Sequence, residues 1–163
     1  MSPTAQKIYM IFIKNIFSRQ NILMPITKDN IKHLLTCTGG RLVCDPHSKT
    51  TSVTPDGITG YHIQYNPQTA PFPLYDICYL WCQTMLSLNT NGVIHFPLKD
   101  DPTIQNLCKE LTIHMLMPDW YFEKIIEKHT TDHKVNLTRI SCETCLPVSV
   151  LRLRGNQLRY WSI

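Results

Sequence analysis

The sequence predicts an α+β fold in which a small, mainly antiparallel sheet packs on a helical bundle. Apolar and polar side chains alternate with period two at residues 58–66, which is typical of a half-buried strand. Apolar residues recur at helical spacing at residues 103–117, which indicates an amphipathic helix. The chain has 163 residues, of which 43% are hydrophobic and 17% charged, so it can bury a core and lacks the composition of a disordered protein.

Residues 1–26 are expected to form an apolar leader or a helix before a single domain at residues 27–163. The apolar stretch at residues 8–17 is interrupted by Lys14 and Asn15 and is shorter than the roughly twenty residues that cross a bilayer. No small-residue cleavage site follows it, as a secretory signal would require. We therefore expect neither a membrane segment nor a membrane partner.

The first half of the domain is predicted to contain one helix and two strands. Thr27 is placed to cap a helix in which Ile31, Leu34 and Leu35 share a face, and Gly39-Gly40 is placed to end it. The segments that follow are expected to be a strand at 41–44, a polar, turn-rich stretch at 47–55, the strand at 58–66 and a proline-rich loop at 67–73.

The second half is predicted to be mainly helical. Pro118-Asp119 separates two helices, because proline cannot continue the first one. The expected elements are a central apolar helix at 74–88, a short strand at 93–96, and helices at 103–117, 120–128, 136–141 and 147–154.

Seven cysteines at irregular spacing argue against a disulfide framework and favour a reduced, cytoplasmic compartment. They are Cys37, Cys44, Cys78, Cys82, Cys108, Cys142 and Cys145.

Three motifs in the last ninety or so residues resemble those of the ImmA/IrrE-like zinc metallopeptidases. LYDICYLWCQTMLSL (residues 74–88) is followed by KELTIHMLMPDW (109–120) and then by VSVLRLRG (148–155). The family pattern is an F-T-L-A-H-E-L-G-H-Y-L-L-H helix, then E-x-x-A-N-x-F-A-x-x-L-L-M-P, then a short V-S-x-x-A-V-x-x-R-L helix. The resemblance implies a zincin-like core with short C-terminal helices.

The residues that would bind zinc in this family are absent at the matching positions. In such peptidases two histidines one helical turn apart share the metal, and the glutamate between them acts as general base. The alignment puts Tyr79 and Leu80 at the first histidine and the glutamate, Gln83 at the second histidine, and Gln105 at the acidic third ligand. A neutral amide is a poor zinc ligand. The resemblance therefore implies a degenerate, catalytically inactive member without a zinc cofactor.

The resemblance also implies a partner. Members of the family typically recognise a helix-turn-helix repressor of a phage or mobile element and cleave it. A member without zinc would regulate by stoichiometric binding to such a repressor or to another DNA-associated protein. We expect the partner to add to the edge of the strand at 58–66 through main-chain hydrogen bonds, with Tyr61, His62, Gln64 and Tyr65 as binding residues.

Two other functions are compatible with the sequence. One is a metal-dependent hydrolase with relocated ligands, drawn from Cys78, Cys82, Cys108 or His114. The other is nucleic-acid binding by the basic C-terminal helices, with Arg152, Arg154 and Arg159 on phosphates. The formal net charge of only +4, and the leucines between these arginines, instead favour a solvated rim on a packed helix.

A structural metal site is a further possibility near the C-terminus. His129, His133, Cys142 and Cys145 form an H-x3-H-x8-C-x2-C pattern of two imidazole and two thiolate ligands. The spacing between the two pairs is shorter than in familiar zinc modules. The preferred interpretation is that these residues bind no metal.

Overall fold

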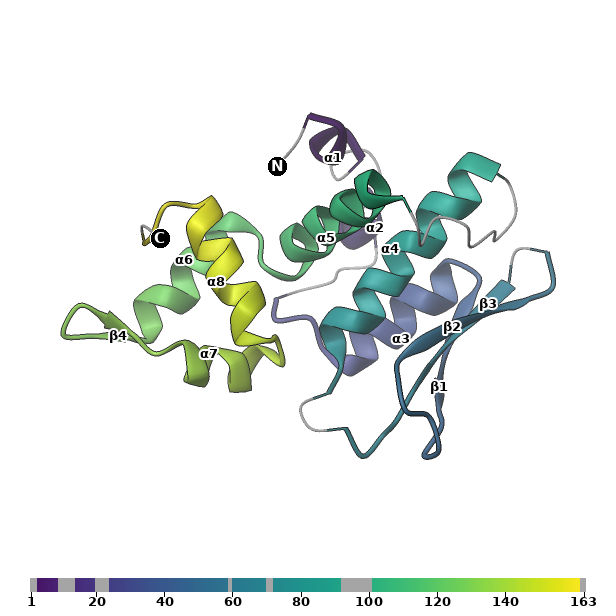
Figure 1. Ribbon diagram of the computed structural model, residues 1–163, viewed down its shortest axis with the longest axis horizontal. Coiled ribbons are helices and arrows are strands. Elements are labelled where there is room, and N and C mark those ends of the chain that lie inside the picture. Colours follow the sequence, from purple (N-terminus) through teal and green to yellow (C-terminus); the bar gives the residue numbers. More distant parts are fainter. Residues whose placement is uncertain are drawn as a thin grey trace.

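The computed structural model describes residues 3–8, 14–19, 24–58, 60–69, 72–91 and 101–161. Within them the fold is α+β, as predicted (Figure 1). The helices are α1 (Pro3–Ile8), α2 (Lys14–Arg19), α3 (Lys28–Cys37), α4 (Leu74–Asn91), α5 (Pro102–Leu116), α6 (Asp119–Lys128), α7 (Leu137–Thr144) and α8 (Val148–Gln157). The strands are β1 (Gly40–Cys44), β2 (Ser52–Asp56), β3 (Gly60–Tyr65), β4 (Thr130–Thr131) and β5 (Lys134–Val135).

The molecule is arranged as two halves joined by α5 (Figure 1). The sheet half contains α3, α4 and the sheet β1–β3, and the C-terminal half contains α6, α7, α8 and the β4–β5 hairpin. α5 packs on α4 and leads through Met117 and Pro118 into α6. One apolar core runs through both halves, from Ile26 to Leu151.

The three-stranded sheet is mixed and has the order β1-β3-β2. β3 pairs in parallel with β1 and antiparallel with β2. The predicted alternation in β3 is confirmed, because Tyr61, Ile63 and Tyr65 are buried against the helices while the residues between them are half-buried. β2 lies in the stretch that was expected to be only polar turns. Its side chains are largely exposed, so it lacks the apolar alternation that identifies a strand.

The helices largely follow the predicted boundaries, and their ends have clear local causes. At the start of α3, Thr27 Oγ1 accepts a hydrogen bond from the Asn30 backbone N–H and Asn30 Oδ1 accepts one from the Thr27 N–H, which forms a capping box. Gly39 follows α3 with φ of 80°, a conformation that glycine adopts without steric cost. At the start of α5, Asp101 caps the Thr103 N–H at 2.8 Å. The expected strand at 93–96 lies outside the described residues, as does part of the apolar stretch at 8–17.

The chain turns back on itself after α8. The Trp161 ring lies against Gly155 and packs near Phe122, with the two ring centroids 6.2 Å apart. A Cβ atom at residue 155 would collide with the indole, so the close contact requires glycine. None of the described helices combines the length and the apolar character needed to cross a membrane.

Candidate functional site

The α4 positions aligned with zinc ligands carry a closed, neutral pair. Gln83 is 3% exposed, and its Nε2 donates to the Tyr79 hydroxyl at 3.2 Å. The Tyr79 ring stacks on Tyr75, one turn earlier, with centroids 6.3 Å apart. Leu80 is half-buried beside them and is apolar. This face of α4 therefore presents a hydrogen-bonded amide and phenol where a zincin presents imidazoles and a carboxylate.

The fourth aligned position, Gln105, lies half-buried near the start of α5, the helix that packs on α4. It is three residues before Cys108, so the two share a helical face. Cys108 interacts electrostatically with Tyr79 and Cys82 of α4. Among the residues that the structure describes, no three His, Cys, Asp or Glu side chains converge on a common point.

The thiols of Cys78, Cys82 and Cys108 lie where burial disfavours their charged form. Burial raises the pKa of Cys82 and of Cys108 to about 12, and it raises the pKa of Cys78 well above its usual value. Without a metal these groups therefore remain protonated thiols at neutral pH. The packing gives no support to a hydrolase with ligands drawn from these cysteines.

Arg154, one of the three arginines of the nucleic-acid alternative, is buried, with only 1% of its area exposed. Its Nε donates to the Met117 carbonyl at 2.9 Å, its Nη1 lies 3.3 Å from His114 Nε2, and its Nη2 pairs with Asp119. It also donates to Gln157 Oε1 at 3.2 Å. Arg154 thus joins α5, α6 and α8, and its guanidinium is fully used inside the protein.

His114 is shaped by the same cluster. Burial and the neighbouring Arg154 charge lower its pKa to about 4, so it is neutral at ordinary pH. A neutral imidazole beside a guanidinium is a hydrogen-bond acceptor rather than a free metal ligand. His114 is therefore held in the Arg154 cluster, next to the guanidinium.

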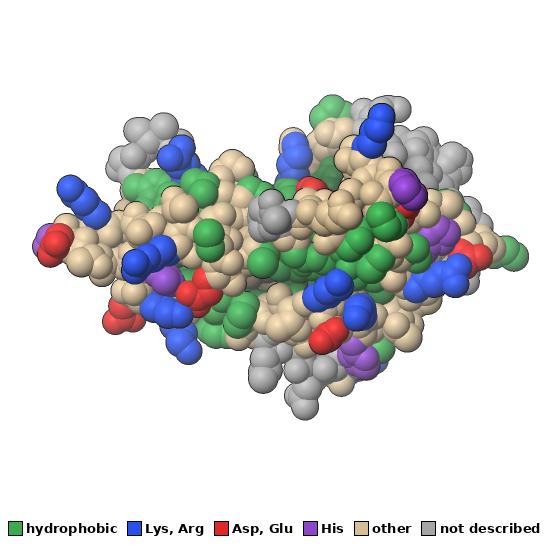
Figure 2. Space-filling model, turned by 90° about the horizontal axis from the view of Figure 1, so that it is seen from below, with side chains coloured by type: hydrophobic (Ala, Val, Ile, Leu, Met, Phe, Trp, Pro, Cys, Tyr) green, Lys and Arg blue, Asp and Glu red, His purple; other side chains and the backbone are tan. Residues whose placement is uncertain are grey.

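The other two arginines do not form a basic patch with Arg154. Arg152 is exposed on α8, and Arg159 is exposed beyond its end in a left-handed conformation with φ of 60°. Figure 2 shows that, on the face displayed, Lys and Arg side chains over the C-terminal half are interspersed with acidic and uncharged ones. The alternative of a three-arginine phosphate site is therefore not supported, because its central member points into the core.

The residues of the alternative His/Cys metal pattern are engaged elsewhere or exposed. His129 Nε2 lies 2.7 Å from Glu143 Oε2, and Lys128 Nζ donates to the other oxygen of Glu143 at 2.7 Å. These contacts lower the pKa of Glu143. His133 is exposed in the turn of the β4–β5 hairpin, and Cys142 is exposed on α7. Within the described part of the chain these side chains do not meet at one metal position.

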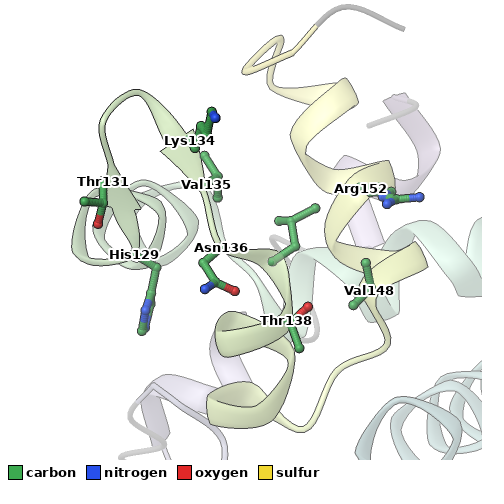
Figure 3. A pocket seen from close by; sticks show the side chains of 9 residues that line it. His129, Thr131, Lys134, Val135, Asn136, Thr138, Val148 and Arg152 are labelled. Carbon is green, nitrogen blue, oxygen red and sulfur yellow. The ribbon is translucent and has the colours of Figure 1, made fainter.

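A pocket of about 470 Å³ lies between the β4–β5 hairpin, the start of α7 and α8 (Figure 3). In Figure 3 Lys134 and Arg152 lie on opposite sides of it, and their side chains point away from one another. A second hollow of about 360 Å³ shares Leu137 and Arg152 with it and also contacts Trp161. These two cations therefore do not converge on one point in the pocket. Sequence reasoning missed it because three separate segments build it.

The expected partner-binding strand is the central strand of the sheet, so that prediction is wrong. β3 has neighbours on both sides and offers no free edge. Tyr61 and Tyr65 are each 1% exposed and belong to the core. The Tyr61 hydroxyl lies 2.7 Å from Thr38 Oγ1, and Cys44 Sγ donates to the Tyr65 hydroxyl at 3.0 Å. His62 and Gln64 lie half-buried on the opposite face, in contact with each other at 3.3 Å.

The free edge of the sheet is instead β1. The Tyr61 N–H donates to the Gly39 carbonyl, and the Asp45 N–H donates to the Tyr65 carbonyl. With the parallel register, these bonds direct the main-chain groups of Arg41 and Val43 toward β3. The N–H and C=O groups of Leu42 therefore face outward, and no other described residue pairs with them.

The opposite edge, β2, is less able to pair with a further strand. Tyr61 and Ile63 use their main-chain groups on β1, so His62 and Gln64 pair with β2, and Val53 and Pro55 face outward there. Pro55 lacks an N–H at an outward position, which is where proline is tolerated in a sheet. Such a residue interrupts pairing with a further strand. Pro55 was the signal in the sequence that could have identified β2 as an edge strand.

Comparison with protein-family models, with curated proteins and with solved structures finds no match to this chain.

Proposed function

We propose that this chain is a non-catalytic regulator with a metallopeptidase-like core, which acts by stoichiometric binding to another protein. The supporting observation is the Tyr79–Gln83 pair on α4. Peptide hydrolysis by a zincin requires two imidazole ligands and a carboxylate general base at these positions. Here the Gln83 amide donates to the Tyr79 phenol at 3.2 Å, and the position between them that matches the general base is Leu80. A helix face of this composition suits packing and recognition rather than metal chemistry.

The proposed partner is a helix-turn-helix regulator, or another DNA-associated protein, of a phage or mobile element. This partner class comes from the resemblance of the motifs at 74–88 and 109–120. All seven cysteines are free, which fits a reducing cytoplasm where such regulators act. Direct nucleic-acid binding is less well supported, because Arg154 is committed to the core.

We place the binding surface at the β1 edge. An extended segment of the partner would pair with the outward groups of Gly40, Leu42 and Cys44, in place of the buried β3. Main-chain pairing supplies affinity without any catalytic group. Arg41, exposed on the outer face of the sheet and paired with Asp56 at 3.0 Å, would lie beside the added strand.

The test uses the helix-turn-helix protein encoded nearest to this chain's gene. Calorimetric titration of the two purified proteins is expected to give saturable binding at one to one, and intact mass measurement is expected to show an unshortened partner. Absence of binding would overturn the partner assignment. Metal-dependent shortening of the partner would overturn the non-catalytic function.

Two matched proline variants test the surface. Leu42→Pro removes an outward N–H from β1, and Val53→Pro removes an outward N–H from the opposite edge, β2. We expect Leu42→Pro to weaken binding at least tenfold and Val53→Pro to leave it nearly unchanged, with both variants folded by circular dichroism. Equal affinities would rule out the β1 edge while leaving the proposed partner in place.

A further inference from the structure

His33 and Cys37 form a close pair on the solvent face of α3. They are one helical turn apart, and the His33 Nε2 and Cys37 Sγ atoms are separated by 3.7 Å. Both side chains are exposed, since α3 buries the opposite face through Ile31, Leu34 and Leu35. An imidazole and a thiol at this spacing are directed to the same point above the helix.

The separation matches that of two ligands on a tetrahedral zinc ion. With zinc–sulfur and zinc–nitrogen bonds of about 2.3 and 2.05 Å, the two ligand atoms are about 3.6 Å apart. The observed distance of 3.7 Å is close to this value. A metal could therefore bind to the pair without a change in the helix.

We propose that His33 and Cys37 form a surface site for zinc or a similar thiophilic divalent cation. Zinc binds the thiolate, so the Cys37 thiol gives up its proton to solvent as the metal enters, and the His33 nitrogen binds in its neutral form. No third His, Cys, Asp or Glu side chain of the described residues completes the group. Two positions on the metal thus remain open for water or for a ligand from another molecule.

The site is separate from the zincin positions. It lies on α3, before the sheet, whereas Tyr79, Leu80 and Gln83 lie on α4. A zinc ion with only two protein ligands should be bound more weakly, and exchange more readily, than one in the closed four-ligand sites of structural zinc. The nearby Asp29, one turn before His33, adds a negative charge to the same exposed face, although Lys32 pairs with it at 3.3 Å. The site is therefore suited to reversible binding rather than to a permanent cofactor.

The test uses the full-length, tag-free, reduced and metal-stripped protein, titrated with Co²⁺ and with Zn²⁺. We expect a thiolate-to-cobalt charge-transfer band in the near ultraviolet, displaced by zinc, and release of a proton. Zinc competition against a chromophoric chelator should give at most one ion per chain. Cys37→Ser and His33→Gln should each lower zinc affinity at least tenfold and abolish or weaken the band.

The matched control is Cys142→Ser, which removes another exposed thiol, on α7. It should leave the band and the zinc affinity unchanged. The site would be overturned if the wild-type protein gave no band, if the two α3 variants bound as well as the wild type, or if the control lost as much affinity. Because partner shortening is a different readout, none of these results bears on the proposed non-catalytic function.

Discussion

The two halves of the molecule bury polar groups in different ways. In the sheet half, Thr38 Oγ1 accepts a hydrogen bond from Trp81 Nε1 at 3.1 Å and contacts the Tyr61 hydroxyl, so α3, α4 and β3 are joined by neutral groups. Burial raises the pKa of Tyr61 to about 12, so that phenol stays neutral. At the junction with the C-terminal half, Arg154 places a full positive charge in the core.

This difference determines what each region can tolerate. A neutral cluster loses only its hydrogen bonds when a member is changed, and it does not respond to ordinary pH. A buried charge is stable only while all of its hydrogen-bonding and ionic partners are present. Removing one partner leaves an uncompensated group in a medium of low polarity. The C-terminal junction should therefore be the more fragile part of the fold, and the only one of the two that acid weakens.

The largest effect is expected for Arg154→Met. The variant leaves the Met117 carbonyl without its donor and His114 and Asp119 without the guanidinium, so it should lower the free energy of unfolding by about 3–4 kcal/mol. Urea denaturation measures this change. Arg152→Met, at an exposed position of the same helix, is the control and should change stability by less than about 0.5 kcal/mol. Equal effects would show that the charge does not organise the junction.

The second prediction concerns pH. The pKa of His114 is about 4 in the folded protein, compared with 6.5 for an unperturbed histidine, so between these values the unfolded chain binds more protons. The free energy of unfolding should therefore fall by about 2–3 kcal/mol as the pH is lowered from 6.5 to 4. Denaturation curves across this range measure the fall, and His114→Gln should flatten it. A wild-type profile that coincides with that of the variant would contradict the prediction.

A smaller effect is expected in the neutral cluster. Thr38→Val keeps the shape of the side chain but removes the hydroxyl that serves Trp81 and Tyr61, which should cost about 1–2 kcal/mol. The loss should be the same at pH 7 and pH 5, in contrast to the Arg154 cluster. Thr36→Val, which changes an exposed hydroxyl on the same helix, should have a much smaller effect.

The smallest effect is expected for the Tyr79–Gln83 pair on α4. Tyr79→Phe removes the acceptor of the Gln83 amide and should lower stability by about 0.5–1 kcal/mol. Because Tyr79 lies on α4 and not on β1, affinity for a partner that binds the β1 edge should not change. A loss of partner binding in a stable variant would move the binding surface from the sheet edge to α4.

The helices could largely be predicted from local signals in the sequence. Thr27 and Asn30 lie at capping-box spacing, Gly39 allows the left-handed turn after α3, and Pro118 separates α5 from α6. These causes act within a few residues. The alternation in β3 was likewise sufficient to predict which of its side chains are buried.

The order of the strands could not be predicted in the same way. Which strand is central depends on pairings between segments that are distant in sequence. A central strand and an edge strand show the same alternation when one face of the sheet is exposed, so the pattern in β3 does not distinguish them. Arg154 shows a similar limit. Its burial depends on Met117, some 37 residues earlier, and no periodicity in α8 reports that contact. The predicted exposed edge of β3 and the exposed position of Arg154 were wrong, because long-range contacts decide whether each is exposed.

The contact between Gly155 and Trp161 has a consequence for the history of the sequence. The indole occupies the space where a side chain at 155 would begin, so the two positions can change only together. In an alignment of homologues, alanine or larger residues at 155 should accompany a small residue, or a chain end, in place of the tryptophan. Such paired substitutions would identify relatives of this protein more reliably than the apolar pattern of α4, which many apolar helices share.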